Sequence, residues 1–135
     1  MAVEKHVVID TNVLVSALLT NQQSPPVDIM QLVRSGILAV CYDERIMAEY
    51  LDVLLRPSFG FDPTELRAIL RPIRRFGIDV YPFPLEQKTE DPDDQAFYEV
   101  ASLCFCPLVT GNKRHYPDEP HIMTPAEYLA AMREG

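Results

Sequence analysis

Four places in the chain put oxygen-bearing side chains at the end of an apolar run or on the face of an expected helix. The first is Asp10-Thr11-Asn12, which follows the apolar run Val7-Val8-Ile9. The others are Glu49, the acidic run Asp91-Pro92-Asp93-Asp94, and Asn112 after Thr110-Gly111. Carboxylate and amide oxygens without Cys or His partners favour hard cations such as Mg²⁺ or Mn²⁺. One or two such ions could polarise a phosphodiester and activate water, so these residues indicate an acidic catalytic pocket.

A plainer structural explanation is open for each of these residues. Asp10 or Thr11 could serve only as the cap of the following helix, with Thr11 well placed for that role. Glu49 lies along the apolar face of its expected helix, where it could pair with Arg45, four residues earlier. Asn112 could be an ordinary turn residue. None of these alternatives alone explains why four such places occur in one chain.

The acidic run 91–94 holds more carboxylates than a helix cap needs. Acids in the first turn of a helix interact favourably with its dipole, which is the plain explanation for this run. Asp91 and Asp94 are three residues apart and can face the same side of the chain. We expect Asp93 to point elsewhere, into solvent.

Strands and helices alternate along the chain, so we expect one α/β domain over residues 1–135. The expected strands are 3–9, 37–42, 78–81, 107–110 and 121–123. The expected helices are 11–19, 26–36, 43–55, 62–77, 91–103 and 126–132, with a possible kink at Pro72. This alternation predicts a parallel five-stranded sheet in a three-layer α/β/α sandwich. In such sheets ligands bind outside the carboxyl ends of the strands, where Asp10 and Asn112 are expected.

Composition places the protein in the cytoplasm and disfavours simple electrostatic coating of nucleic acid. The net charge is −8, so nucleic acid is repelled unless cations or local basic groups intervene. The three cysteines lie in or next to apolar runs and suit buried thiols in a reducing compartment, not a disulfide frame or zinc site. We find no signal peptide, no membrane-spanning run and no phosphate-binding glycine loop.

The motifs resemble the PIN-domain family of metal-dependent nucleases over nearly the whole chain. The resemblance rests on Val8-Ile9-Asp10-Thr11-Asn12, the internal Glu49, Asp91-x-x-Asp94 followed by Ala101, and Leu108-Val109-Thr110-Gly111-Asn112. The ending Ile122-Met123-Thr124-Pro125-x-Glu127-Tyr128-Leu129 also resembles the VapC-like branch, the toxin components of bacterial toxin–antitoxin pairs. The family fold implies strand order 3-2-1-4-5.

The resemblance also implies roles for individual residues. The family's first, second and third acids fall on Asp10, Glu49 and Asp94, with Asp91 as an extra acid that helps to hold the metal. The family often carries a fourth Asp after Thr-Gly, where this chain has the neutral Asn112. That difference weakens the case for a second tightly held ion. Thr11, Asn12 and Asn112 would be accessory residues that orient ligands or water.

The expected function is therefore that of a Mg²⁺- or Mn²⁺-dependent endoribonuclease of toxin type, hydrolysing RNA with metal-activated water. Lys113 and Arg114 would bind RNA phosphates, and the group Arg71-Arg74-Arg75 would either join them or form a solvated helix face. Toxin-type relatives are held inactive by a small antitoxin protein and often form homodimers or higher homo-oligomers.

Two other interpretations remain open. The first is a PIN-like binding or assembly module that no longer cleaves, supported by Asn112 and the charge of −8. The second is a phosphatase with Asp10 as nucleophile, which is weaker because Asn12 replaces the second acid of a D-x-D pair. Metal affinity at the acidic pocket separates the nuclease from the binding module.

Overall fold

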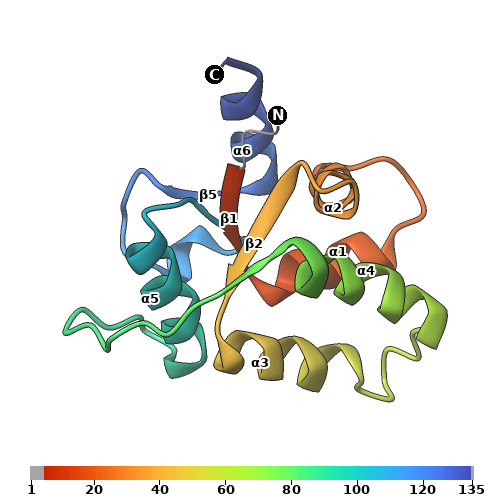
Figure 1. The fold of residues 1–135 in the computed structure, drawn as a ribbon, viewed down its shortest axis with the longest axis horizontal. Coiled ribbons are helices and arrows are strands. Elements are labelled where there is room, and N and C mark those ends of the chain that lie inside the picture. The colour runs from red at the N-terminus through yellow and green to blue at the C-terminus, as the bar shows by residue number, and fades with distance from the viewer. Residues whose placement is uncertain (1–4, 135) are drawn as a thin grey trace.

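A five-stranded parallel sheet organises the computed structural model, which describes residues 5–134 (Figure 1). The strands are β1 Lys5–Ile9, β2 Leu38–Tyr42, β3 Ile78–Asp79, β4 Leu108–Val109 and β5 Ile122–Met123. Their order is β3-β2-β1-β4-β5, and every neighbouring pair is parallel. The expected fold class and strand order are confirmed. The sheet order reverses between β1 and β4, so the ends of these two strands lie side by side.

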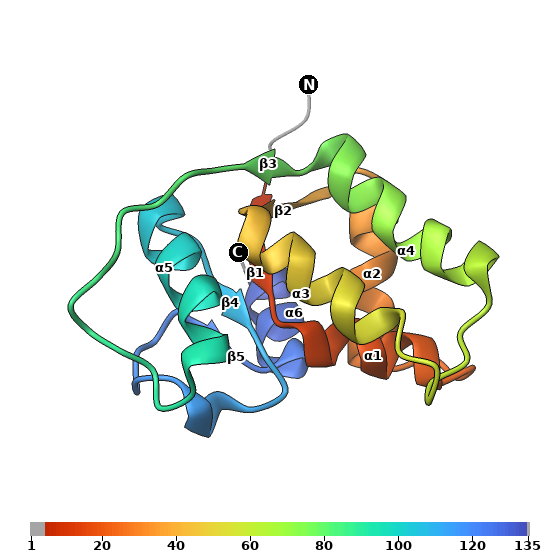
Figure 2. The same cartoon turned by 90° about the horizontal axis from the view of Figure 1, so that it is seen from below.

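Six α-helices cover the sheet and join its strands. They are α1 Thr11–Leu19, α2 Pro25–Arg34, α3 Glu44–Leu54, α4 Pro63–Phe76, α5 Gln95–Cys104 and α6 Pro125–Glu134. Helix α5 lies on one side of the sheet, and α1, α2 and α4 lie on the other (Figure 2). Helix α3 contacts both α1 and α5, while α6 packs on α2 and β5. The sheet is therefore the middle layer between helices.

Several local expectations are confirmed, and three are wrong. Asp43 accepts a hydrogen bond from the backbone N–H of Ile46 (2.9 Å) and caps α3 as expected. The N-cap position of α1 falls on Asp10, so Thr11 is not the cap but the first helical residue. Residues 92–94 form a 3₁₀ turn, η1 Pro92–Asp94, because Asp91 accepts from the N–H of Asp93 and tightens the chain there. The third strand ends at Asp79, before Pro82 and Pro84 interrupt further pairing.

The boundaries of the remaining elements agree with the expected ranges to within a few residues. Asp62 begins α4 with a capping box that it shares with Glu65. Pro72 is accommodated inside α4. The first two residues of the expected first strand, Val3 and Glu4, lie outside the described residues.

A buried tyrosine joins α3 to the end of β1. Tyr50 is fully buried, packs against Phe97 with ring centroids 6.2 Å apart, and donates a hydrogen bond to the carbonyl of Ile9 (2.5 Å). Because Asp10 follows Ile9 and Glu49 precedes Tyr50, this contact brings two acids that are far apart in sequence to one end of the sheet. Cys41 of β2 and Cys106 are buried as expected, whereas Cys104 is only half-buried, and all three thiols are free.

No helix within residues 5–134 is long and apolar enough to cross a membrane.

Candidate active site

A hollow of about 300 Å³ lies where β1 and β4 end. It is lined by Asp10, Thr11, Asn12, Val15, Glu49, Val53, Asp91, Asp93, Asp94, Asn112 and His115. All four predicted acids and all three predicted accessory residues therefore line one surface depression. Lys113 and Arg114 lie outside it, in a neighbouring hollow that they share with Tyr116.

Asp10 is the most buried of these acids, with 6% of its surface exposed. Its Oδ2 accepts hydrogen bonds from the Thr110 hydroxyl (2.9 Å) and from the Tyr116 hydroxyl (2.9 Å). Burial raises the pKa of Asp10, and these two hydrogen bonds oppose that rise by stabilising the carboxylate. Both side-chain donors bind Oδ2, which fixes the orientation of the carboxylate, and the backbone N–H groups of Asn12 and Thr11 also help to lower its pKa.

Sequence reasoning missed Thr110 and Tyr116 as site residues. Thr110 lies directly before the Gly111-Asn112 turn and could have been found as a polar residue ending a buried strand. Tyr116 carries no such signal in the sequence. It reaches Asp10 because the 3₁₀ turn η2 Lys113–His115 folds the chain back over the end of β4.

Glu49 is half-buried and does not form the alternative pair with Arg45. Its Oε2 accepts a hydrogen bond from the Thr11 hydroxyl (3.2 Å). Arg45 instead pairs with Asp43 (2.7 Å) and with the buried Glu99 (2.9 Å). Burial is the main cause that raises the pKa of Glu49, with smaller contributions from the charges of Asp93 and Asp10. Thr11 thus acts as a donor to a site acid, which explains its place at the start of α1 better than capping does.

Asp94 carries the clearest sign of an unmet interaction. Its Oδ2 is buried and has no hydrogen-bond partner among the described residues. Nδ1 of the His115 imidazole lies 3.6 Å from this oxygen, beyond hydrogen-bond distance, and the Asp94 side chain is 13% exposed. Burial, followed by the charges of Asp10 and Asp91, raises the pKa of Asp94 to about 6. A buried carboxylate oxygen without a partner is costly, so this position suits a bound cation or a proton.

The other two acids of the run are more exposed. Asp91 uses Oδ1 to accept from the N–H of Asp93 (2.9 Å), so it caps its own turn while it lines the hollow. Asp93 is exposed, as expected, yet it also borders the hollow instead of pointing away from it.

The two asparagines stand at the rim where the ends of β1 and β4 meet. Asn12 accepts a hydrogen bond through its side-chain oxygen from the N–H of Gly111 (3.0 Å), which ties the two strand ends together. A Cβ on Gly111 would lie 3.3 Å from that oxygen, so this approach is close. The exposed Asn112 follows, and its N–H donates to the Thr110 hydroxyl (3.0 Å).

The donor set suits a hard divalent cation, although the described part of the chain holds no preformed group of metal ligands. Within residues 5–134, no three His, Cys, Asp or Glu side chains are placed closely enough to hold a metal ion together. Mg²⁺ and Mn²⁺ prefer oxygen ligands, and the hollow offers three carboxylates. Oδ2 of Asp94 has no hydrogen-bond partner, while Asp10 and Glu49 each accept side-chain hydrogen bonds on one oxygen only. The residues fit such an ion in chemistry, and binding would require their side chains to converge.

Fold and site together define an α/β protein with a carboxylate-lined hollow at the switch between two parallel strands. A PIN domain family model matches residues 6–114, so the chain belongs to the PIN domain family. Members of this family are typically metal-dependent nucleases. No curated protein and no solved structure matches the chain significantly.

Proposed function

We propose that this PIN-domain protein is a Mg²⁺- or Mn²⁺-dependent endoribonuclease and the toxin component of a toxin–antitoxin pair. The observation that carries the nuclease proposal is the buried, unpartnered Oδ2 of Asp94, in the same hollow as Asp10 and Glu49. A site that raises the pKa of three carboxyl groups favours any ligand that neutralises them. The family match supports the same chemistry.

In this proposal, Asp10, Glu49 and Asp94 hold the cation, and Asp91 at the rim adds negative charge. When bound, the cation would supply Lewis-acid polarisation of the phosphodiester and activation of water. Thr110 and Tyr116 hold Oδ2 of Asp10 so that the other oxygen remains available. Thr11 orients the Glu49 carboxylate by its hydrogen bond to Oε2. Asn12 and Asn112 shape the rim, and their amides can orient substrate or water.

Lys113 and Arg114 would bind the RNA backbone beside the hollow. Both are exposed and belong to η2, which connects the rim residue Asn112 to the buried Tyr116. Lys113 forms an exposed pair with Glu127 of α6 (3.1 Å), which it can exchange for a phosphate at little cost.

The proposal is tested by incubating labelled single-stranded RNA with purified protein in Mg²⁺, in Mn²⁺ and in chelator. We expect internal cleavage that requires a cation and stops when chelator is added. Binding of the same cations is measured in parallel by calorimetry. Folded protein that binds neither cation and cuts no RNA would contradict the nuclease proposal.

Replacing Tyr116 with Phe is expected to reduce metal affinity or cleavage by about 10- to 100-fold, the range typical of residues that orient a metal ligand. The ring stays in place while Oδ2 of Asp10 loses one of its two donors. The measurement is the cation concentration that gives half-maximal cleavage.

A matched control for Tyr116→Phe is Tyr98→Phe. Tyr98 is equally buried, and its hydroxyl contacts Glu119 (2.9 Å) instead of a residue of the hollow. Equal effects of the two substitutions on the cation requirement would refute a positioning role for Tyr116.

The toxin role is a separate part of the proposal and rests on the resemblance of the segment 122–129 to the toxin branch. It implies a small antitoxin protein as partner and a homodimer or higher homo-oligomer. Expression of the protein without its antitoxin should stop growth, and Asp10→Asn should relieve that arrest. Normal growth at high levels of active nuclease would exclude the toxin role while leaving the nuclease intact.

A second candidate function is a PIN-like module that binds a partner without cleaving. The specific observations in its favour are Asn112 at the usual place of a fourth acid and the lack of a preformed three-residue metal cluster among residues 5–134. Calorimetry separates the two functions, since a binding module has no need to hold a cation in this hollow.

A further inference from the structure

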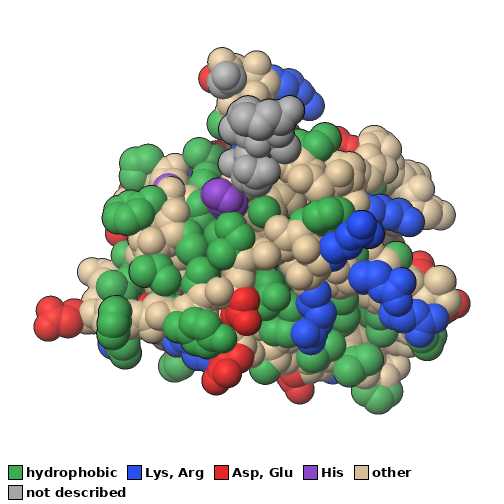
Figure 3. Space-filling model, in the orientation of Figure 1, with side chains coloured by type: hydrophobic (Ala, Val, Ile, Leu, Met, Phe, Trp, Pro, Cys, Tyr) green, Lys and Arg blue, Asp and Glu red, His purple; other side chains and the backbone are tan. Residues whose placement is uncertain are grey.

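Outside the carboxylate hollow, the strongest feature of the surface is a concentration of arginines on α2 and α4. Five of the 12 lysines and arginines of the chain gather there, in a protein whose net charge is −8. They are Arg34, Arg67, Arg71, Arg74 and Arg75, which we call the arginine face. Figure 3 shows blue side chains collected on one part of the surface over these helices.

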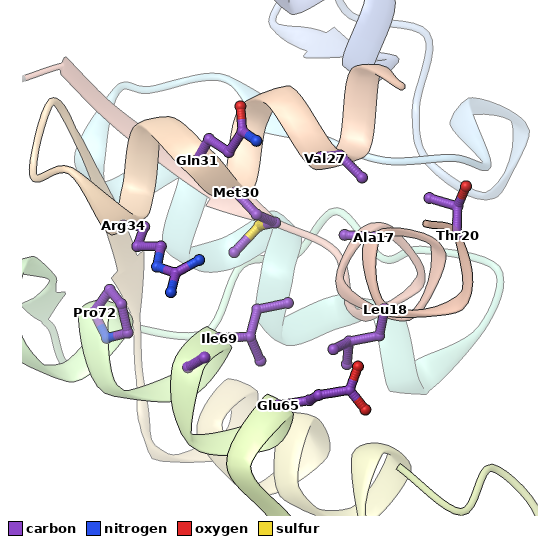
Figure 4. Close-up of a pocket in the computed structure, with 11 residues that line it drawn as sticks. Ala17, Leu18, Thr20, Val27, Met30, Gln31, Arg34, Glu65, Ile69 and Pro72 are labelled. Atoms are coloured by element: carbon purple, nitrogen blue, oxygen red, sulfur yellow. The ribbon is translucent and has the colours of Figure 1, made fainter. Parts of the chain in front are cut away.

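The arginine face results from the spacing of the arginines along α4 and from the packing of α2 beside α4. Arg67, Arg71 and Arg74 are separated by four and three residues, so they lie along one side of α4 and line one hollow of about 390 Å³. Arg34 of α2 lines a second hollow with Arg67 and Arg71. Figure 4 shows the Arg34 side chain extending from α2 toward α4.

These arginines have no acidic partners within the described part of the chain. All five are exposed, and none forms an ion pair with a carboxylate of residues 5–134. Asp62 and Glu65, the acids nearest in sequence to Arg67, are engaged in the capping box of α4. Asp79, the acid nearest in sequence to Arg75, forms no ion pair with these arginines, although Asp79 and Arg74 both influence Tyr42. Guanidinium groups held close together repel one another, and their planar forks match phosphate oxygens. The face therefore fits a polyanion.

Two exposed aromatic rings follow α4 and β3 in the chain. Tyr81 and Phe83 are 77% and 84% exposed and alternate with Pro82 and Pro84 in the segment after β3. Tyr81 and Arg74 both lie near Tyr42, whose pKa is raised by burial first and then by Asp79, while Arg74 lowers it. An open ring near an arginine, such as Tyr81 near Arg74, is the kind of feature on which the bases of a single strand stack.

Helix α3 connects the arginine face with the carboxylate hollow. Val53 lines the carboxylate hollow, and Leu55, just past the last residue of α3, lines the arginine hollow with Arg67, Arg71 and Arg74. An α-helix with its side chains is about 10–12 Å across. A strand that crosses α3 would therefore need only a few nucleotides to reach from one surface to the other.

We propose that the arginine face binds the phosphate backbone of single-stranded RNA and leads the strand over α3 into the carboxylate hollow. This inference rests on the proposed nuclease function and assigns to it a substrate-binding surface. An acidic protein segment would also meet the positive charge. The exposed ring of Tyr81 near Arg74 favours RNA, as does the closeness in the chain of Val53 and Leu55, which line the two hollows.

The test measures binding of a labelled single-stranded RNA of about 20 nucleotides by fluorescence anisotropy in chelator, so that no cleavage occurs. The variant is Arg67→Gln/Arg71→Gln/Arg74→Gln, in which Gln preserves helix propensity. The control is Lys5→Gln/Lys88→Gln/Arg133→Gln, which removes the same charge from exposed positions elsewhere. Circular dichroism and thermal melting verify that both variants fold.

We expect the arginine variant to bind at least tenfold more weakly at low salt, and the control to remain within about twofold of the wild type. The slope of log Kd against log salt should fall by about 2, at roughly 0.7 for each lost phosphate contact on a single strand. Equal weakening in both variants would overturn the proposal, as would wild-type protein that binds no RNA at low salt. Polyglutamate of matched charge serves as competitor, and competition as strong as that of RNA would assign the face to an acidic protein segment instead.

Cleavage assays separate failure of this inference from failure of the proposed function. A dinucleotide has a single phosphodiester, which must lie in the carboxylate hollow to be cut, so its metal-dependent cleavage reports on that hollow alone. If the arginine variant cuts both the long RNA and the dinucleotide as fast as the wild type does, the nuclease stands and the arginine face is refuted. If neither RNA is cut by any form but the arginine variant still loses binding, the nuclease fails and the RNA-binding surface stands.

Discussion

Asp10→Asn is expected to reduce metal-dependent RNA cleavage by about 1000-fold or more, a loss of about 4 kcal/mol in transition-state stabilisation. Asp10 is the acid held most firmly in the hollow, since Thr110 and Tyr116 both donate to its Oδ2. An Asn can present its amide oxygen to the same two donors, which preserves the local packing. Its NH₂ group would then take the place of Oδ1, which accepts neither of these side-chain hydrogen bonds, and an NH₂ group cannot bind a cation.

The decisive measurement compares initial cleavage rates at saturating Mn²⁺ with thermal melting of the same preparations. Asp52→Asn is the matched control because it makes the same chemical change at an exposed position of α3, where the pair with Arg56 contributes little stability. A variant of Asp10 that cleaves at the wild-type rate would move the active site elsewhere. A variant that fails to fold would assign Asp10 to stability, and the nuclease would then have to be judged from Glu49→Gln.

The architecture was predictable because the hydrophobic runs and the turn residues of this chain agree with one another. The alternation of strands and helices yields a parallel α/β sheet from periodicity alone, while the strand order followed from the family resemblance. The predicted boundaries of elements are wrong where a polar side chain forms hydrogen bonds with the backbone. The carboxylate of Asp91, for example, turned an expected helical start into a 3₁₀ turn.

The acids of the site were also predictable, but the residues that orient them were not. Asp10 and Asp94 stand at element ends where the residue types alone suggest a role, and Glu49 is an acid on an apolar helix face. Tyr116 contributes through a contact with a residue 106 positions away, and no local pattern encodes such a contact. Thr11 shows the converse case, because a residue type suited to capping donates instead to Glu49.

Asp94→Asn is expected to make the cation-free protein more stable above pH 6 while it removes most of the stabilisation that Mn²⁺ confers. The pKa of Asp94 is raised to about 6, mainly by burial, so the folded protein holds a proton that the unfolded chain releases near pH 4. Stability is therefore lost as the pH rises from about 4 to 6, and above pH 6 the folded wild type bears the full cost of the buried charge. Asn bears no such charge. We expect a gain of about 1–2 kcal/mol, or about 3–8 °C in Tm, after allowance for partial exposure.

Thermal melting of both proteins between pH 4 and 8, with and without Mn²⁺, measures this difference. The gain in Tm of the variant should vanish below about pH 4, where the wild-type carboxyl group is protonated in both states. Asp52→Asn is the control, because this exposed residue of α3 lies outside the hollow, and the substitution should change neither the Tm nor the response to Mn²⁺ appreciably. An Asp94→Asn protein that Mn²⁺ stabilises as much as the wild type would remove Asp94 from the ligand set. If Asp94 binds the cation but destabilises the cation-free fold, its replacement must have two opposite effects. The cation-free protein becomes more stable, and the stabilisation by Mn²⁺ becomes smaller.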